Sequence, residues 1–290
     1  MSSALRAIIE PGFFASSPVQ LALEVATAVA LVASVIGVFT VIRGQAFAGH
    51  SLADLNATGG AAAFLVGVGA LWGFIAISIS AAGAMQAVGI ERRRGRDLAT
   101  GIVLGAGLGL AALLLYLVST TSHDSGATNL VLFGSMFAFS SSTIVPVVAL
   151  GLVALAIVAV VYRPLLLSSV SPELAAARGV PIRLVGTLYL LALAAAVALS
   201  CLAIGAILST ALLIGPPAAA LRLTRRPWLA IAAACAIALT SCWVGVLLAY
   251  DSYYWDWPPH QDGWPVSFFI VTLVFLAYLA ARTRSPRSRR

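Results

Sequence analysis

The segment Ser171–Arg183, with the sequence SPELAAARGVPIR, decides the fold because it is the one well-marked water-soluble helix in an otherwise apolar chain. Ser171 is a good N-cap, and Pro172 takes the first helical position, where its missing N–H costs nothing. Arg178 suits the negative end of the helix dipole, and Gly179 is a typical stop signal. The segment therefore predicts a helix of about two turns between two apolar spans.

Arginines on both sides predict that this helix is cytoplasmic. Arg163 precedes it and Arg183 follows it, and cytoplasmic loops of membrane proteins carry an excess of basic residues. A plain loop would suffice to join two spans, so a capped helix suggests a surface against which a cytoplasmic partner presses. The alternative, a loop that curls without any partner, stays open at this point.

The composition predicts an integral membrane protein of the all-α class. The chain has 290 residues, of which 61% are hydrophobic and 9% are charged, whereas soluble domains are about a quarter charged. A spanning helix needs about 20 apolar residues, which leaves room for about eight to ten spans and for no sizeable soluble domain. We therefore expect residues 1–290 to form a single transmembrane domain.

The basic residues indicate topology rather than nucleic-acid binding. The net charge is +7, but every basic residue is Arg, and most of them lie in short clusters at the ends of spans. With about nine transmembrane helices and the N-terminus outside, all these clusters fall on the cytoplasmic side. Residues 1–18 are then an interfacial lead-in, and residues 282–290 are an Arg-rich cytoplasmic tail. The predicted spans are 19–42, 46–69, 71–90, 98–118, 146–162, 184–202, 204–221, 228–250 and 266–281.

Charged groups inside the membrane are costly, and they tend to face a cavity or a partner. His50 and Asp54 are four residues apart, which places them on one face of a helix. Imidazole and carboxylate both bind zinc and manganese. Two ligands make a weak site, which suits a transport path because the ion must leave it as readily as it enters. The alternative is a neutral histidine hydrogen-bonded to its neighbouring aspartate. Glu24 is a further candidate, as a third ligand, as a proton carrier or as a solvated interfacial group.

A second acidic group lies in the predicted outer loop near residue 260. Asp251, Asp256, His260 and Asp262 are of the kinds that attract a cation at an outer mouth, although loops of this composition are more often only solvated. No lysine is present, which excludes a P-loop, and no metalloprotease or serine-nucleophile motif occurs. We therefore expect a transport subunit rather than an enzyme, with ATP hydrolysis, if it is used, supplied by a separate subunit.

Five segments together resemble the zinc/manganese-type ABC transporter permeases, the membrane subunits of bacterial metal-ion importers, over nearly the full length of the chain. They are AFAGHSLADLNATGG (46–60), RRRGRDLATGIVLGAGLGL (92–110), LFGS (132–135), YRPLLLSSVSPELAAARGVPIRL (162–184) and IGAILSTALLIGPPAAALRL (204–223). Within the last segment, the sequence Gly215-Pro216-Pro217 predicts a helix interrupted inside the membrane.

The resemblance implies a multi-pass protein of the bacterial cell membrane that forms a homodimer, or a heterodimer with a related permease. It implies cytoplasmic ABC ATPase subunits below and an extracytoplasmic metal-binding protein above, with a divalent metal ion as cargo and no stably bound cofactor. The helix at 172–178 then resembles a coupling helix that sits in a groove of the ATPase. Its expected coupling residues are Pro172, Glu173, Leu174, Ala176, Arg178 and Gly179.

Two departures from the family pattern limit what the resemblance implies. The family typically has an acid followed four residues later by histidine, whereas here His50 comes first and Asp54 second. The motif LFGS is usually followed by an acidic residue, whereas this chain has serines at 140–142. Both residues of the pair still share a face, so a divalent cation fits, but the resemblance does not name the metal.

Other function classes stay open at this point. An ABC permease for a metal chelate of the siderophore or cobalamin type has a similarly built coupling region, and a wide path without charged ligands would favour it. A secondary transporter coupled to protons or sodium would use Glu24 and Asp54 as carriers, but it leaves the capped helix unexplained. An intramembrane enzyme has the least support, because no nucleophile and base can be placed at one depth.

Overall fold

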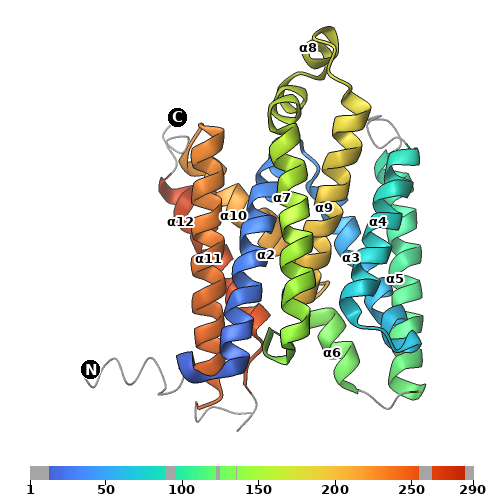
Figure 1. Cartoon of the computed structure of the whole chain (residues 1–290), viewed down its shortest axis with the longest axis vertical. Coiled ribbons are helices and arrows are strands. Elements are labelled where there is room, and N and C mark those ends of the chain that lie inside the picture. Colours follow the sequence, from blue (N-terminus) through green and yellow to red (C-terminus); the bar gives the residue numbers. More distant parts are fainter. Residues whose placement is uncertain (1–12, 89–95, 122–124, 135, 255–262, 285–290) are drawn as a thin grey trace.

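The computed structural model describes residues 13–88, 96–121, 125–134, 136–254 and 263–284, and all regular elements in that part of the chain are helices (Figure 1). The elements are η1 (Phe13–Ala15), α2 (Ser17–Ile42), α3 (Ala46–Val66), α4 (Ala70–Val88), α5 (Arg96–Thr121), α6 (Ser125–Phe133), η2 (Met136–Ala138), α7 (Ser141–Val170), α8 (Pro172–Ala177), α9 (Ile182–Ile204), α10 (Ser209–Leu223), α11 (Pro227–Ser252) and α12 (Val266–Arg284). The predicted all-α class is confirmed.

Within the described residues, five helices are by length and composition able to cross a membrane, namely α2, α7, α9, α11 and α12. Each of the other four predicted spans coincides with one of the helices α3, α4, α5 and α10. Helix α10 has 15 residues, and the segments Ala70–Gln86 of α4 and Leu104–Thr120 of α5 are shorter apolar helices. The multi-pass character is thus supported by the described residues, and the count of nine spans stays a prediction.

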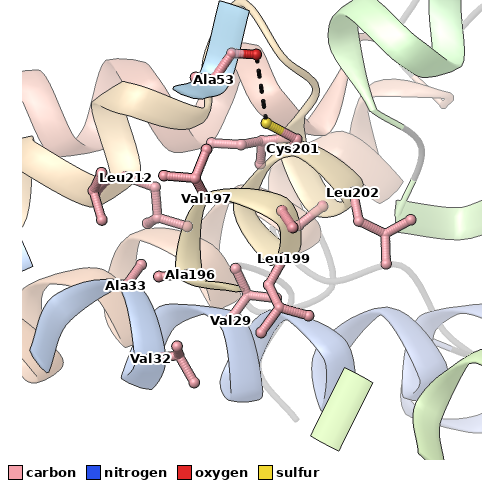
Figure 2. Close-up of a cluster of buried hydrophobic side chains, with 14 of the residues drawn as sticks. Val29, Val32, Ala33, Ala53, Ala196, Val197, Leu199, Cys201, Leu202 and Leu212 are labelled. Carbon is pink, nitrogen blue, oxygen red and sulfur yellow. Dashed lines mark hydrogen bonds between the residues drawn. The ribbon is translucent and has the colours of Figure 1, made fainter. Parts of the chain in front are cut away.

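The core of the bundle lies around α2 and α9. Helix α2 packs against α7, α9, α10 and α11, while α9 also packs against α3 and α4. Small and branched side chains predominate here, which lets helix backbones approach closely. Figure 2 shows part of this core, built from Val29, Val32, Ala33, Ala53, Ala196, Val197, Leu199, Cys201, Leu202 and Leu212.

The predicted interruption at Gly215-Pro216-Pro217 is wrong, because α10 continues through both prolines. Pro217 has no N–H to donate to the carbonyl of Leu213, four residues earlier. That carbonyl lies against Gly37 of α2, where a Cβ would clash with the Leu213 oxygen and would lie 2.7 Å from Cγ of Pro217. The absence of a side chain at Gly37 therefore lets α2 cover the part of α10 where the backbone hydrogen bonding is incomplete.

Two of the segments that carry the family resemblance contact each other. The N–H of Ile207 donates to the carbonyl of Leu132 at 3.3 Å, and Gly134, two residues beyond Leu132, has a φ of +72°. A Cβ at Gly134 would lie 2.6 Å from the carbonyl oxygen of Ala203. The LFGS motif therefore ends α6 against the turn between α9 and α10. Helix α6 lies partly in a polar stretch for which the sequence predicted no helix.

The chain alternates direction from one long helix to the next, and the arginines gather at one end of the bundle. Figure 1 shows α8 at that end, with α2 beginning at the opposite end. Arginines of the described residues near helix ends at the α8 end are Arg43, Arg163, Arg178, Arg183, Arg222, Arg225, Arg226 and Arg282. This gathering agrees with the clustering on one side that the sequence predicted.

Candidate functional site

A tight corner sets the position of α3, the helix that carries the predicted ligand pair. Three residues, Arg43 to Gln45, separate α2 from α3, and Gly44 adopts a left-handed φ of +63°. The N–H of Gln45 donates back to the carbonyl of Thr40 at 2.9 Å. Because the corner is short and internally hydrogen-bonded, it leaves α3 little freedom relative to α2, and His50 follows in the second turn of α3.

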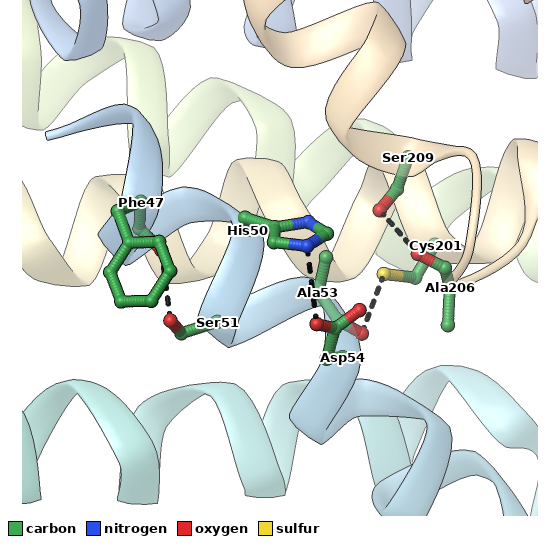
Figure 3. A network of polar contacts seen from close by, with 8 residues as sticks. All are labelled: Phe47, His50, Ser51, Ala53, Asp54, Cys201, Ala206 and Ser209. Atoms are coloured by element: carbon green, nitrogen blue, oxygen red, sulfur yellow. Dashed lines mark hydrogen bonds and ion pairs between the residues drawn. The ribbon is translucent and has the colours of Figure 1, made fainter. Parts of the chain in front are cut away.

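His50 and Asp54 share one face of α3, as predicted. Nε2 of His50 lies 3.4 Å from Oδ2 of Asp54, and the two side chains are 48% and 15% exposed (Figure 3). An imidazole and a carboxylate at this separation present two hard or borderline ligands to a divalent cation. No group of three or more histidine, cysteine or acidic residues that could hold a metal ion gathers within the described part of the chain. The described residues of one chain therefore offer a ligand pair rather than a complete site.

Buried polar contacts fix the rotation of α3 about its axis. Asn56 accepts a hydrogen bond from Ser78 of α4 at 2.9 Å, and its amide donates to Sγ of Cys201 of α9 at 3.4 Å. Thr58 donates to the carbonyl of Gly107 of α5 at 2.8 Å. These contacts hold one face of α3 inside the bundle, so that His50 stays half-exposed. Ser78 could not be identified from the sequence, because a serine inside an apolar span gives no signal about its distant partner.

Cys201 closes this network behind the ligand pair, as Figure 3 shows. Its Sγ lies 3.9 Å from the carbonyl oxygen of Ala53, and the side chain is completely buried. Ser209 beside it donates to the carbonyl of Ala206 at 3.0 Å. Cys201 is a free thiol that packs inside the protein, so the described geometry gives it no access to a cation bound at His50 and Asp54.

Glu24 lies apart from the pair, on α2. Its side chain is exposed and lines a groove of about 610 Å³ between α2, α7 and Trp243 of α11. The groove is otherwise mostly apolar, and Trp243 donates to Thr27 at its edge at 3.0 Å. Glu24 does not join His50 and Asp54 in one chain. Asp251 is buried at the end of α11, and the remaining candidates, Asp256, His260 and Asp262, lie outside the described residues.

Helix α8 forms with the cap that its sequence predicts. Oγ of Ser171 accepts from the N–H of Leu174 at 3.2 Å, and Pro172 begins the helix. The helix ends at Ala177, one residue before the predicted end, with Arg178 as its C-cap. Ala175 is completely buried against the bundle. All of the predicted coupling residues are exposed, namely Pro172, Glu173, Leu174, Ala176, Arg178 and Gly179.

Known proteins share this sequence pattern and fold. A manganese transport system membrane protein, MntC, from Halalkalibacterium halodurans is 31% identical over 210 residues, which cover 72% of this chain and 71% of that protein. The high-affinity zinc uptake system membrane protein ZnuB from Haemophilus influenzae is 27% identical, over 77% of this chain and 85% of that protein. PsaBC from Streptococcus pneumoniae, solved in complex with Fab, has the same fold, with a TM-score of 0.79, 23% identity and coverage of 96% and 95%.

The family comparison agrees with these similarities over almost the whole helical bundle. The sequence pattern of the ABC 3 transport family matches residues 16–282, which extend from the N-cap residue of α2 to the last turn of α12. The matched region includes the ligand pair on α3 and the capped helix α8. The chain therefore belongs to the ABC 3 transport family.

Proposed function

We propose that the chain is the membrane permease subunit of an ATP-binding-cassette importer that carries a divalent metal ion, zinc or manganese, into the cell. Membership of the ABC 3 transport family and the manganese and zinc transport proteins among the relatives support this function. The observation that favours a bare metal ion over a chelate as cargo is the pair of His50 and Asp54, whose side chains lie 3.4 Å apart on α3.

A dimer would complete the ligand set. One chain supplies an imidazole and a carboxylate, whereas zinc takes about four ligands and manganese more. A second permease copy facing the half-exposed His50 would add an equivalent pair, so that the cation passes between the copies with two ligands from each. Weak binding by such a pair suits transport, because the ion must leave as readily as it enters. The metal is thus cargo rather than a resident cofactor.

The end of the bundle with α8 would face the cytoplasm, and α8 would dock to the ATPase subunit. The arginines at that end support this orientation, because basic residues favour the cytoplasmic side. Leu174 is 45% exposed on α8 and would offer the ATPase subunit an apolar contact. An extracytoplasmic metal-binding protein would deliver the ion at the opposite end.

A metal chelate is the second candidate cargo. A metal-chelate type ABC transporter in an inward-facing conformation has the same fold, with a TM-score of 0.73 and 16% identity over 91% of this chain and 85% of that chain. This likeness extends to the fold alone. A chelate needs a wide path and gains nothing from two exposed metal ligands, so the His50–Asp54 pair favours the bare ion.

Cellular metal content tests the proposed function. Zinc, manganese and iron would be measured by elemental mass spectrometry in cells with the gene intact, deleted or restored, all grown under chelator. A selective fall in zinc or manganese in the deletion strain, reversed on restoration, is the expected result. Unchanged metal contents after removal of redundant importers would contradict the bare-ion function and favour a chelate.

A further inference from the structure

Arg43 lies where α2, α3 and α7 meet at the α8 end of the bundle. Its Nη1 donates to Oγ of Ser168 at 3.2 Å and to Oγ of Ser169 at 3.4 Å, in the last turn of α7. Its Nε donates to Oε1 of Gln45 at 3.3 Å, in the corner before α3. One guanidinium group thus joins the end of α7 to the start of α3.

The two serines are oriented to accept from Arg43. Both hydroxyls donate to the carbonyl of Leu165 within α7, so the remaining lone pairs of their oxygens are free for the guanidinium. The serines also lie directly before α8, because Ser171, its N-cap, follows two residues after Ser169 and donates its N–H to the carbonyl of Leu167 at 3.0 Å. A displacement of α8 must therefore move the serines that Arg43 holds.

The guanidinium of Arg43 also stacks on the ring of Tyr189 of α9. The carbon at the centre of the guanidinium lies 5.1 Å from the centroid of the Tyr189 ring, and this tyrosine is completely buried. Its hydroxyl lies 2.7 Å from Oγ1 of Thr40, which in turn donates to the carbonyl of Ile36. A cation over a desolvated aromatic ring is held more firmly than an exposed one. The rigid support means that Arg43 does not simply swing away when α8 moves.

On its other side Arg43 leads to the ligand pair. Gln45 is the residue before α3, and its carbonyl accepts from the N–H of Gly49 at 3.1 Å. His50 is five residues beyond Gln45, which is about 7.5 Å along a helix. Because α3 is a hydrogen-bonded rod over this distance, a shift of the corner is passed on to His50 with little loss.

We propose that Arg43 is a positioning residue that couples the ATPase-driven movement of α8 to the position of the His50–Asp54 pair. This inference rests on the proposed function. Arg43 touches neither the ATPase nor the cation in this account. It links the two through Ser168 and Ser169 on one side and Gln45 on the other. The sequence predicted only that basic residues at the ends of spans, Arg43 among them, indicate topology.

The test is the number of metal ions imported per ATP hydrolysed by the permease and its ATPase in liposomes, with the extracytoplasmic metal-binding protein supplied on the side from which the ion enters. The probes are zinc and manganese ions, whichever the wild-type complex transports. We expect Arg43→Ala to lower this ratio by about tenfold, within the range usual for coupling between distant sites. Arg43→Lys should keep part of it, because an ammonium group still donates to both serines but lacks the planar fork.

Two comparisons separate coupling from a structural role. Arg222→Ala is the matched control. Arg222 lies at the same end of the bundle, 5.0 Å from the centroid of the Tyr278 ring, and donates to the Tyr278 hydroxyl at 2.8 Å. It differs from Arg43 in that it joins α10 to α12. It should leave the ratio unchanged. The double variant Ser168→Ala with Ser169→Ala keeps the charge and should lower the ratio, and adding Arg43→Ala to it should lower it no further.

The outcomes distinguish the inference from the function on which it rests. A wild-type complex that imports neither metal would contradict the proposed function. A wild-type complex that imports metal, with the same ratio in Arg43→Ala or in the double serine variant, would overturn the role of Arg43 alone. If Arg43→Ala does not assemble, Arg43→Lys and the double serine variant decide the question. Loss of folded protein alone lowers uptake and ATP hydrolysis together and leaves the ratio unchanged.

Discussion

Ser78 donates a 2.9 Å hydrogen bond to the amide oxygen of Asn56, and both side chains are buried between α3 and α4. Asn56 lies two residues beyond Asp54, on a part of the helix surface that faces inward while His50 faces outward. Apolar residues are spread around α3 rather than gathered on one face, so packing alone does not set its rotation. The buried amide therefore determines which residues of α3 face the outside of the chain.

Asn56→Ala should destabilise the protein by about 1 kcal/mol and up to about 3, because it leaves the Ser78 hydroxyl buried without its acceptor. Ser78→Ala should cost a similar amount. Thermal unfolding of the purified protein in detergent measures the effect. Thr240→Ala is the control, since Thr240 is exposed and bonds only within α11. Equal melting temperatures for Asn56→Ala and Thr240→Ala would contradict the role of the amide.

The contact between Gly37 and α10 gives a second stability prediction. Gly37→Ala should destabilise by about 1–3 kcal/mol, because its Cβ has no room against the Leu213 carbonyl and α2 must move away. Gly83→Ala is the matched control, as a Cβ at Gly83 meets nothing within 4 Å. It should be neutral or slightly stabilising through helix propensity. The same melting experiment would refute the packing argument if the two variants behaved alike.

The exposed face of α8 gives a prediction about assembly. Leu174→Asp should weaken binding of the ATPase subunit by about tenfold or more, as expected for a central apolar contact, without lowering the melting temperature of the permease. Co-purification of the two subunits over a range of concentrations measures the affinity. Tyr253→Ala, an exposed residue at the opposite end, is the control. Unaltered binding of Leu174→Asp would remove α8 from the ATPase interface.

Local signals allowed the sequence to predict α8 and the shared face of His50 and Asp54. A cap such as Ser171 acts within one turn, and a spacing of four residues fixes a common face on any helix. Nothing beyond the neighbouring residues was needed for either prediction.

Long-range contacts explain what the sequence did not reveal. The prolines of α10 indicated a break, but Gly37, far away in the chain, covers the carbonyl that Pro217 leaves without a donor. Arg43 carried only a topology signal, because its partners Ser168 and Ser169 lie on another helix. The acidic group at 256–262 lies outside the described residues, so its role stays a prediction.

The most direct measurement of the central claim is uptake of radioactive zinc and manganese by liposomes that contain the permease with its ATPase subunit and are supplied with the extracytoplasmic metal-binding protein, with and without ATP. The double variant His50→Ala with Asp54→Ala should lose ATP-dependent uptake by at least about tenfold at limiting metal, since it removes both ligands of the pair. Glu24→Gln removes a carboxylate from the separate groove between α2 and α7 and should keep uptake near the wild-type level. Undiminished uptake by an assembled double variant would contradict the claim that this pair contacts the transported ion.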